Sequence, residues 1–154
     1  MRKFVTVLIA LLALAPLVLA DGAADYGKFC ASCHGATGQG TPGVFPPLAE
    51  WAGHFAQNDE GRAYLVHVIV FGLQGQISAQ GKAYNGFMPP FAQLSNDQVA
   101  AILNYLLSEW NKDLLPKDFR PLTADEVAQL RAKALTPADV FKARQALVQS
   151  LGIK

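Results

Sequence analysis

Sulfur is scarce in this chain of 154 residues, which contains two cysteines and two methionines. Two cysteines cannot hold an iron–sulfur cluster, because such a cluster usually takes four thiolates. Charge is limited as well: only 16% of the residues are charged, and 13 basic side chains face 12 acidic ones. The lack of a basic excess argues against nucleic acid and against an anionic membrane surface as partners.

Both cysteines lie in residues 30–34, which read Cys-Ala-Ser-Cys-His. This spacing predicts covalent attachment of a c-type haem. Each thiol can add to a haem vinyl group as a thioether, and the two intervening residues bring both sulfurs to one edge of the macrocycle. The adjacent histidine is then the proximal iron ligand. The motif therefore predicts three cofactor-binding residues, Cys30, Cys33 and His34.

Three other interpretations of the motif remain open. A thioredoxin-type redox pair has the same spacing, but it expects a preceding strand and a βαβ pattern that the flanking sequence lacks. A zinc site could take its fourth ligand from His54 or His67, although adjacent Cys33 and His34 form a strained pair of ligands. A structural disulfide between the two cysteines is the simplest alternative.

The first 20 residues have the pattern of a secretory signal peptide. Arg2 and Lys3 precede an apolar run that ends at Ala20. A retained membrane anchor is the alternative, since about 17 apolar residues approach the lower limit for a span. Pro16 and the small residue at the end of the run favour cleavage after Ala20. Removal of two of the 13 basic residues leaves 11 against 12 acidic ones in residues 21–154, which have the length of one domain.

Apolar periodicity predicts three helices in the first part of the exported chain, over residues 23–33, 59–72 and 95–110. Ser95 and Gln98 have the spacing of a capping box at the start of the third helix. We expect Tyr105 of this helix to contact Tyr26 of the first.

Residues 35–47 are rich in glycine, threonine and proline and predict a loop. A proximal histidine needs an acceptor for its second ring nitrogen, which fixes the tautomer of the ring. We expect the backbone carbonyl of Pro46 to be the acceptor for His34.

Residues 72–86 lose helical periodicity and contain four glycines, which leaves room for a small β-hairpin. Met88 follows in a proline-stiffened loop and is the only methionine besides the initiator. A thioether 54 residues beyond His34 suits the sixth coordination position of the iron, although the side chain could also be core filler between two phenylalanines. His54 and His67 are weaker candidates, because most such histidines are satisfied core or surface residues.

The C-terminal part of the chain, residues 111–154, carries eight basic and five acidic side chains, whereas residues 21–110 carry three and seven. Two helices are predicted there, because Thr123 with Glu126 forms a capping-box pattern and Thr136 followed by proline begins a second helix. The apolar faces of both are modest. Such charge is more typical of a solvated face than of a docking surface.

Taken together, these motifs resemble those of class I cytochromes c, most closely the soluble Thermus-type cytochrome c. The signature Gly-x-x-x-Tyr-x-x-x-Cys-x-x-Cys-His runs from Gly22 to His34. Further matching segments are residues 45–49, 72–77, 82–88 and 91–94. One departure is the pair Pro89 and Pro90, where the closer relative is expected to have small polar residues, and this affects the stiffness of the loop.

This resemblance implies an all-α, class I cytochrome c fold around one covalent haem c, with a small β-hairpin before the methionine loop. It divides the chain into a signal peptide (1–20), a haem domain (21–110) and a helical C-terminal extension (111–154) that packs on the haem domain. The iron ligands implied are His34 and Met88.

The function implied is that of a soluble, monomeric one-electron carrier in the periplasm, and not of an enzyme. Its donor would be a quinol–cytochrome c reductase or a dehydrogenase, and its acceptor a terminal cytochrome c oxidase. Because lysine is sparse near the motif, we expect docking through apolar surface around Ala31, Phe45 and Phe87. Two alternatives stay open: a haem enzyme or gas sensor with an exchangeable sixth site, and a fixed electron-transfer subunit of a dehydrogenase complex.

Overall fold

The computed structural model describes residues 20–153, so the predicted signal peptide lies outside the described residues except for Ala20. The prediction of a mainly helical fold with a small hairpin is confirmed. The elements, in order, are α1 (Gly22–Phe29), α2 (Ala31–His34), the 3₁₀ helix η1 (Ala52–Gln57), α3 (Asp59–Phe71), β1 (Leu73–Ala79), β2 (Lys82–Met88), α4 (Asn96–Trp110), the 3₁₀ helix η2 (Lys112–Leu114), α5 (Ala124–Arg131) and α6 (Pro137–Leu151). No helix in this part of the chain has the length and apolar character needed to cross a membrane.

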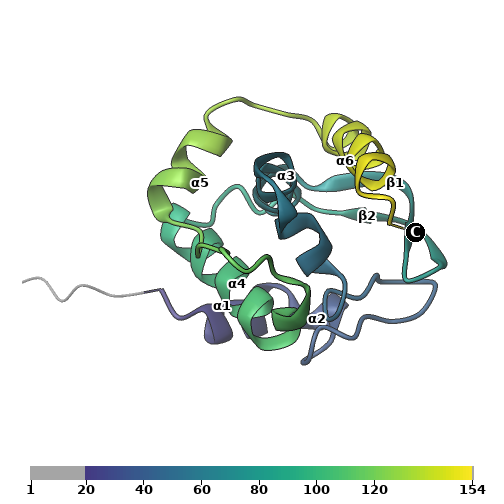
Figure 1. Cartoon of the computed structure of the whole chain (residues 1–154), viewed down its shortest axis with the longest axis horizontal. Helices are drawn as coiled ribbons and strands as arrows, with labels where there is room; N and C mark the ends of the chain where they lie inside the picture. The colour runs from purple at the N-terminus through teal and green to yellow at the C-terminus, as the bar shows by residue number, and fades with distance from the viewer. Residues whose placement is uncertain (1–19, 154) are drawn as a thin grey trace, which may run out of the picture.

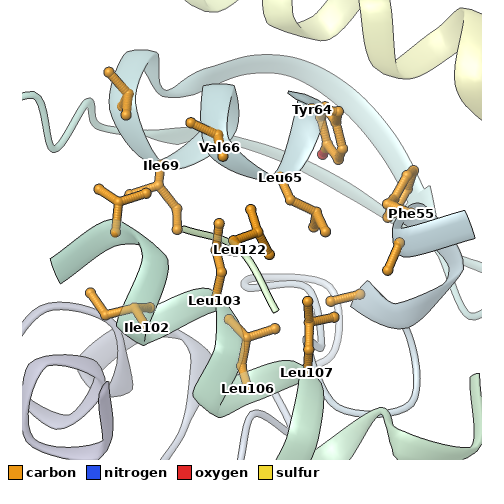
Figure 2. Close-up of a cluster of buried hydrophobic side chains, with 14 of the residues drawn as sticks. Phe55, Tyr64, Leu65, Val66, Ile69, Ile102, Leu103, Leu106, Leu107 and Leu122 are labelled. Atoms are coloured by element: carbon orange, nitrogen blue, oxygen red, sulfur yellow. The ribbon is translucent and has the colours of Figure 1, made fainter. Parts of the chain in front are cut away.

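The core lies between α3 and α4, which face each other across a layer of aliphatic side chains (Figure 2). Val66 and Ile69 come from α3, Ile102 and Leu103 come from α4, and each is at most 6% exposed. Burying a side chain of this size contributes about 1.5–3 kcal/mol to folding. Leu122, which follows α4 in the chain, lies between the two helices in Figure 2. The C-terminal part of the chain therefore shares this core.

The helix predicted over residues 23–33 is interrupted at Cys30. The carbonyl of Cys30 accepts from the backbone N of Cys33 at 3.2 Å and of His34 at 3.0 Å, so the chain restarts there as the short helix α2. Apolar periodicity continues through this point and could not reveal the break. The predicted contact between Tyr26 and Tyr105 is confirmed, with ring centroids 5.9 Å apart, and it fastens α1 to α4.

The helix ends follow the predicted capping patterns in all but one case. Ser95 and Gln98 form a complete capping box at α4, and Thr136 forms one at the start of α6. At α5 the box is only half formed. Thr123 Oγ1 accepts from the backbone N of Glu126, but the Glu126 carboxylate binds Arg62 instead of returning to the cap. A tertiary ion pair has replaced the second half of a local motif.

Strands β1 and β2 form the hairpin, which closes through a tight turn at Gln80 and Gly81, both with positive φ. Its register pairs Leu73 with Met88, so the sheet runs two residues beyond the predicted range. Met88 therefore closes β2, and the irregular segment begins at Pro89. Proline has no backbone N–H to continue the ladder, which explains why the strand ends there.

The two C-terminal helices pack on the rest of the molecule. α5 contacts α3 and α4, and α6 contacts α3 and β1. In Figure 1, α5 and α6 form the upper part of the structure, whereas α1 and α2 lie at its lower edge. Val127 of α5 and Val140 of α6 are fully buried. Both helices therefore add apolar side chains to the interior.

Candidate haem site

The two cysteines of the motif lie at the junction of α1 and α2, half-buried and without a disulfide between them. Burial, together with the nearby Cys33 and Asp25, raises the pKa of the Cys30 thiol to about 11. A redox-active thiol pair needs a lowered pKa, because the thiolate is the reactive form. The environment of Cys30 is therefore the opposite of that of a thioredoxin-type pair.

His34 is buried at the end of α2, with 8% of its surface exposed. Its Nδ1 lies 2.9 Å from the carbonyl oxygen of Pro46, which confirms the predicted contact. A carbonyl only accepts, so Nδ1 carries the proton and Nε2 keeps its lone pair. Burial lowers the pKa of His34, against the opposing effect of the Pro46 hydrogen bond. The ring is therefore neutral at pH 7 and has a fixed orientation.

Glycines shape the loop that brings Pro46 to His34. The backbone N of Gly40 donates to the His34 carbonyl at 2.8 Å, and Gly40 has a φ of +66°. A Cβ at Gly40 would lie 2.5 Å from the carbonyl oxygen of Phe45. A Cβ at Gly38 would lie 2.7 Å from the ring of Trp110. Any larger residue at either position would push the loop away from the histidine.

Met88 lies at the end of β2 and is partly buried. The chain approaches closely on one side, because a Cβ at Gly72 would lie 2.5 Å from the Met88 carbonyl oxygen. Just beyond, the backbone N of Phe91 donates to the carbonyl of Ile69 in α3 at 2.8 Å. The segment that carries Met88 is thus fastened to the C-terminal end of α3.

The hairpin contacts residues 35–50, which follow His34 and are called the His34 loop below, at both of the hairpin's ends. Gly86 of β2 approaches the carbonyl of Val44, with 3.9 Å between a Cβ built on Gly86 and that oxygen. At the hairpin turn, the Gln80 amide donates to the carbonyls of Ala49 and Glu50 at 3.2 and 3.4 Å. The structure thus brings the element that carries Met88 alongside the loop that orients His34.

A sequence model of the family described as cytochrome c matches residues 19–110. The chain belongs to the cytochrome c family. A cytochrome c-552 of Thermus thermophilus is 47% identical over 142 residues, which cover 91% of this chain and 95% of that protein. A second Thermus thermophilus cytochrome c-552 is 48% identical over 128 residues, covering 83% and 97%. The cytochrome c subunit of a quinone alcohol dehydrogenase from Gluconacetobacter polyoxogenes is 34% identical over 71% of this chain, but over only 22% of its own length.

The cofactor of this cytochrome c follows from the family and the motif. The protein carries covalently bound haem c, and Cys30 and Cys33 stand in the Cys-x-x-Cys-His motif of that attachment. Within residues 20–153, no three histidine, cysteine or acidic side chains gather in positions suited to a metal ion. His67 Nε2 lies 2.9 Å from the Leu130 carbonyl, and His54 packs edge-on against Trp51. His67 therefore has a hydrogen-bonded ring nitrogen, and His54 has an aromatic contact.

This cytochrome c contains a buried arginine whose surroundings show whether the fold suits a haem. Arg144 of α6 is 2% exposed, donates to the Ser78 carbonyl at 2.6 Å and lies over the Phe55 ring. No acidic side chain in residues 20–153 pairs with it, and its Nε is buried without a hydrogen-bond partner. Buried charges are normally paired. A haem propionate is a carboxylate of the kind this guanidinium lacks, so the residues present fit the cofactor.

The region around Arg144 also adjoins the His34 loop. Ser78, which accepts from Arg144, is two residues from Gln80, whose amide binds that loop. Burial raises the pKa of the Tyr64 hydroxyl, and the neighbouring Arg144 opposes this effect. The sequence interpretation missed Arg144. It occupies the apolar stripe of α6, four residues after Val140, and a charged residue on such a stripe is the signal that could have found it.

Proposed function

We propose that this cytochrome c is a one-electron carrier whose single haem is attached at Cys30 and Cys33 and whose iron is bound by His34 and Met88. The observation that carries the proposal is the 2.9 Å contact between His34 Nδ1 and the Pro46 carbonyl. It fixes the tautomer that leaves Nε2 for the iron, and it raises the basicity of the ring. When bound, the haem supplies an iron that alternates between the ferric and ferrous states.

The protein's part in this function is to hold the ligands still. His34 is fixed by its contact with the Pro46 carbonyl, and the Met88 segment is fastened to α3. If His34 and Met88 both held the iron in each oxidation state, little would have to rearrange when an electron moves. Met ligation and apolar burial both raise the reduction potential. No side chain is needed for bond chemistry, so the protein acts as a carrier and not as an enzyme.

Arg144 and Tyr64 are the residues that would hold a haem propionate. The guanidinium is buried and has a free Nε, and the hydroxyl lies beside it. A charge-assisted hydrogen bond to the carboxylate would satisfy that Nε. A positive charge at this position also disfavours the extra positive charge of the ferric state, so it raises the potential.

The division of the chain and its location follow the same proposal. Residues 1–20 are removed as a signal peptide after Ala20, residues 21–110 form the haem domain, and residues 111–154 are an extension that packs on it. The mature protein works in the periplasm as a monomer. A quinol–cytochrome c reductase or a dehydrogenase reduces it, and a terminal oxidase reoxidises it. The dehydrogenase subunit among the relatives supports a dehydrogenase as one class of donor.

An exposed apolar patch beside the site is proposed as the docking surface. Val44, Phe45 and Phe87 are large apolar side chains with 56%, 36% and 57% of their surfaces exposed, and Val44 adjoins β2 through Gly86. Apolar contacts depend little on salt, because screening acts on charges. We expect oxidase turnover to change little with added salt and to fall in a Phe87→Ser variant. A steep fall in turnover with salt in the unmodified protein would contradict this surface.

Visible spectroscopy of the matured protein tests the ligand assignment. We expect the weak charge-transfer band from thioether sulfur to ferric iron in the wild type. Met88→Ala should keep the haem, lose the band, bind carbon monoxide in the reduced state and have a lower potential. Met88→His is the matched control, because it should lose the band but stay six-coordinate. A Met88→Ala protein with an unchanged spectrum and potential would overturn the assignment.

A further inference from the structure

The last residue of α5, Arg131, reaches across to the segment that follows Met88. Its Nη1 donates to the Leu94 carbonyl at 2.9 Å and to Asn96 Oδ1 at 2.8 Å, and its Nη2 donates to the Ala92 carbonyl at 2.7 Å. All three acceptors lie within residues 92–96, between β2 and the first turn of α4. One guanidinium therefore holds the second half of this connection and the start of α4 at three points.

Long-range electrostatics does not explain this contact. Asn96 is the first residue of α4, and the N-terminus of a helix carries partial positive charge that repels a cation. Within residues 20–153 no acidic side chain pairs with Arg131. The arrangement instead uses the planar fork of guanidinium donors, which matches acceptors in fixed directions. Its effect is to fix backbone geometry.

The segment itself has few bonds of its own. Pro89 and Pro90 have no backbone N–H to donate. From there to the Ser95 cap, the backbone amides with backbone partners in the described chain are Phe91, which donates to Ile69, and Leu94, which donates to Phe91. Arg131 therefore adds two hydrogen bonds to carbonyls of a connection whose backbone amides make two, and a third to Asn96 directly after it.

We propose that Arg131 is a positioning residue for Met88, and that through it the C-terminal extension controls how readily the thioether leaves the iron. This inference rests on the proposed ligation by Met88. With the connection held at residues 92–96, the strand end cannot swing away from the site without breaking these bonds. Loss of Arg131 frees the connection while the apolar contacts of α5 remain. The extension thus acts on the sixth ligand as well as on stability.

The decisive measurement is the rate at which the oxidised holoprotein binds cyanide, because cyanide can enter only when the thioether has left. We expect Arg131→Gln to bind cyanide about tenfold faster than the wild type, as hydrogen bonds from a charged donor are among the stronger ones. The thioether band should also disappear at a lower temperature than the far-UV circular dichroism signal. Arg131→Lys, which keeps one charged donor, should fall between the two.

Glu126→Gln is the matched control. Glu126 lies on the same helix and binds Arg62, so its replacement weakens the docking of α5 without touching residues 92–96. We expect this variant to unfold at a lower temperature while its cyanide rate, measured well below that transition, stays within about twofold of the wild type. The backbone amides of Phe91 and Leu94 should exchange hydrogen faster in Arg131→Gln than in Glu126→Gln.

The outcomes separate this inference from the proposal beneath it. A wild-type protein without the thioether band overturns ligation by Met88, and this inference with it. A wild-type protein with the band, but with an unchanged cyanide rate in Arg131→Gln, overturns the role of Arg131 alone. Equal acceleration in Arg131→Gln and Glu126→Gln also overturns it, because the effect would then come from general loosening of α5.

Discussion

The first and last parts of the chain are fastened to the molecule in different ways. In residues 20–50, backbone bonds and glycines determine the conformation: Gly40 closes the loop onto His34, and Pro46 supplies a carbonyl. In residues 111–153, long side chains do so. Arg131 and Arg144 of the extension reach carbonyls far away in sequence, and Glu126 binds an arginine of α3.

This difference matches two structural requirements: the backbone around His34 has to be rigid, whereas residues 111–153 have to cover the interior. The iron-binding role that we propose for His34 requires a fixed backbone, and short-range turns provide one without depending on the rest of the fold. A covering segment needs only to stay in place, and a few charged hydrogen bonds over apolar contacts achieve that. The first region also leaves Val44 and Phe45 exposed, whereas the second buries Val127 and Val140. One region presents a surface and the other encloses the interior.

Among the substitutions that test the difference between the two regions, the one at Arg144 should have the largest effect. Arg144→Met should lower the free energy of unfolding of the holoprotein by about 3 kcal/mol, because it would leave the haem propionate that we propose as the partner of Arg144 buried without its counter-charge. The reduction potential should fall as well, since the proposed site of Arg144 beside a haem propionate would lose a positive charge. Chemical denaturation and redox titration measure the two effects.

Lys142→Met is the control for Arg144, because Lys142 is exposed on the same helix. It should change neither quantity by much. If Arg144→Met leaves the potential at the wild-type value, the guanidinium does not face a propionate.

A somewhat smaller effect is expected in the first region. Gly40→Ala should cost about 2–3 kcal/mol of stability, because a Cβ there meets the Phe45 carbonyl at 2.5 Å and φ is positive. Gly43→Ala is the matched control: Gly43 has a φ of +76°, but nothing lies within 4 Å of its Cβ position. It should cost only about 1 kcal/mol. Equal losses in thermal denaturation would show that the closeness of the loop is unimportant.

Glu126→Gln should have a smaller effect still, about 1–2 kcal/mol, because the amide keeps part of the hydrogen bonding to Arg62. Denaturant titration of the holoprotein gives the value. Asp125→Asn, an exposed neighbour on the same helix, should alter stability by a few tenths of a kcal/mol. A loss as large in Asp125→Asn would indicate that helix-end charge matters there, and not the ion pair.

The smallest expected effect is on the pH dependence of the stability. The hydrogen bond from Arg62 lowers the pKa of Glu126 below its ordinary value. A lowered folded-state pKa gives stability that is fully present above the unfolded-state pKa, about 4.3, and is lost as pH falls through the folded-state value. The stability difference between wild type and Glu126→Gln should therefore be constant from about pH 7 to 5 and shrink below about pH 4. Thermal unfolding at each pH measures it, and a difference that grows in acid would contradict a lowered pKa of Glu126 in the folded state.

Local patterns predicted much of the fold and the orientation of the proposed proximal ligand. The capping box at Ser95, the helix start at Thr136 and the His34–Pro46 contact all involve residues close in the chain or a motif with one dominant geometry. The break at Cys30 and the half-formed box at Thr123 were not predictable in this way. The first leaves periodicity unchanged, and the second depends on Arg62, which lies 64 residues from Glu126.

The choice of acceptors in the extension affects how this protein can change by mutation. Arg131 and Arg144 bind mainly backbone carbonyls, at Leu94, Ala92 and Ser78. Every residue has a carbonyl, so the side chains at these positions can be exchanged without removing the acceptor. The arginines themselves have no such freedom. Substitutions should therefore be tolerated at the residues whose carbonyls accept these hydrogen bonds. They should be tolerated much less at Arg131 and Arg144, so these two positions should vary less than the surface that the extension covers.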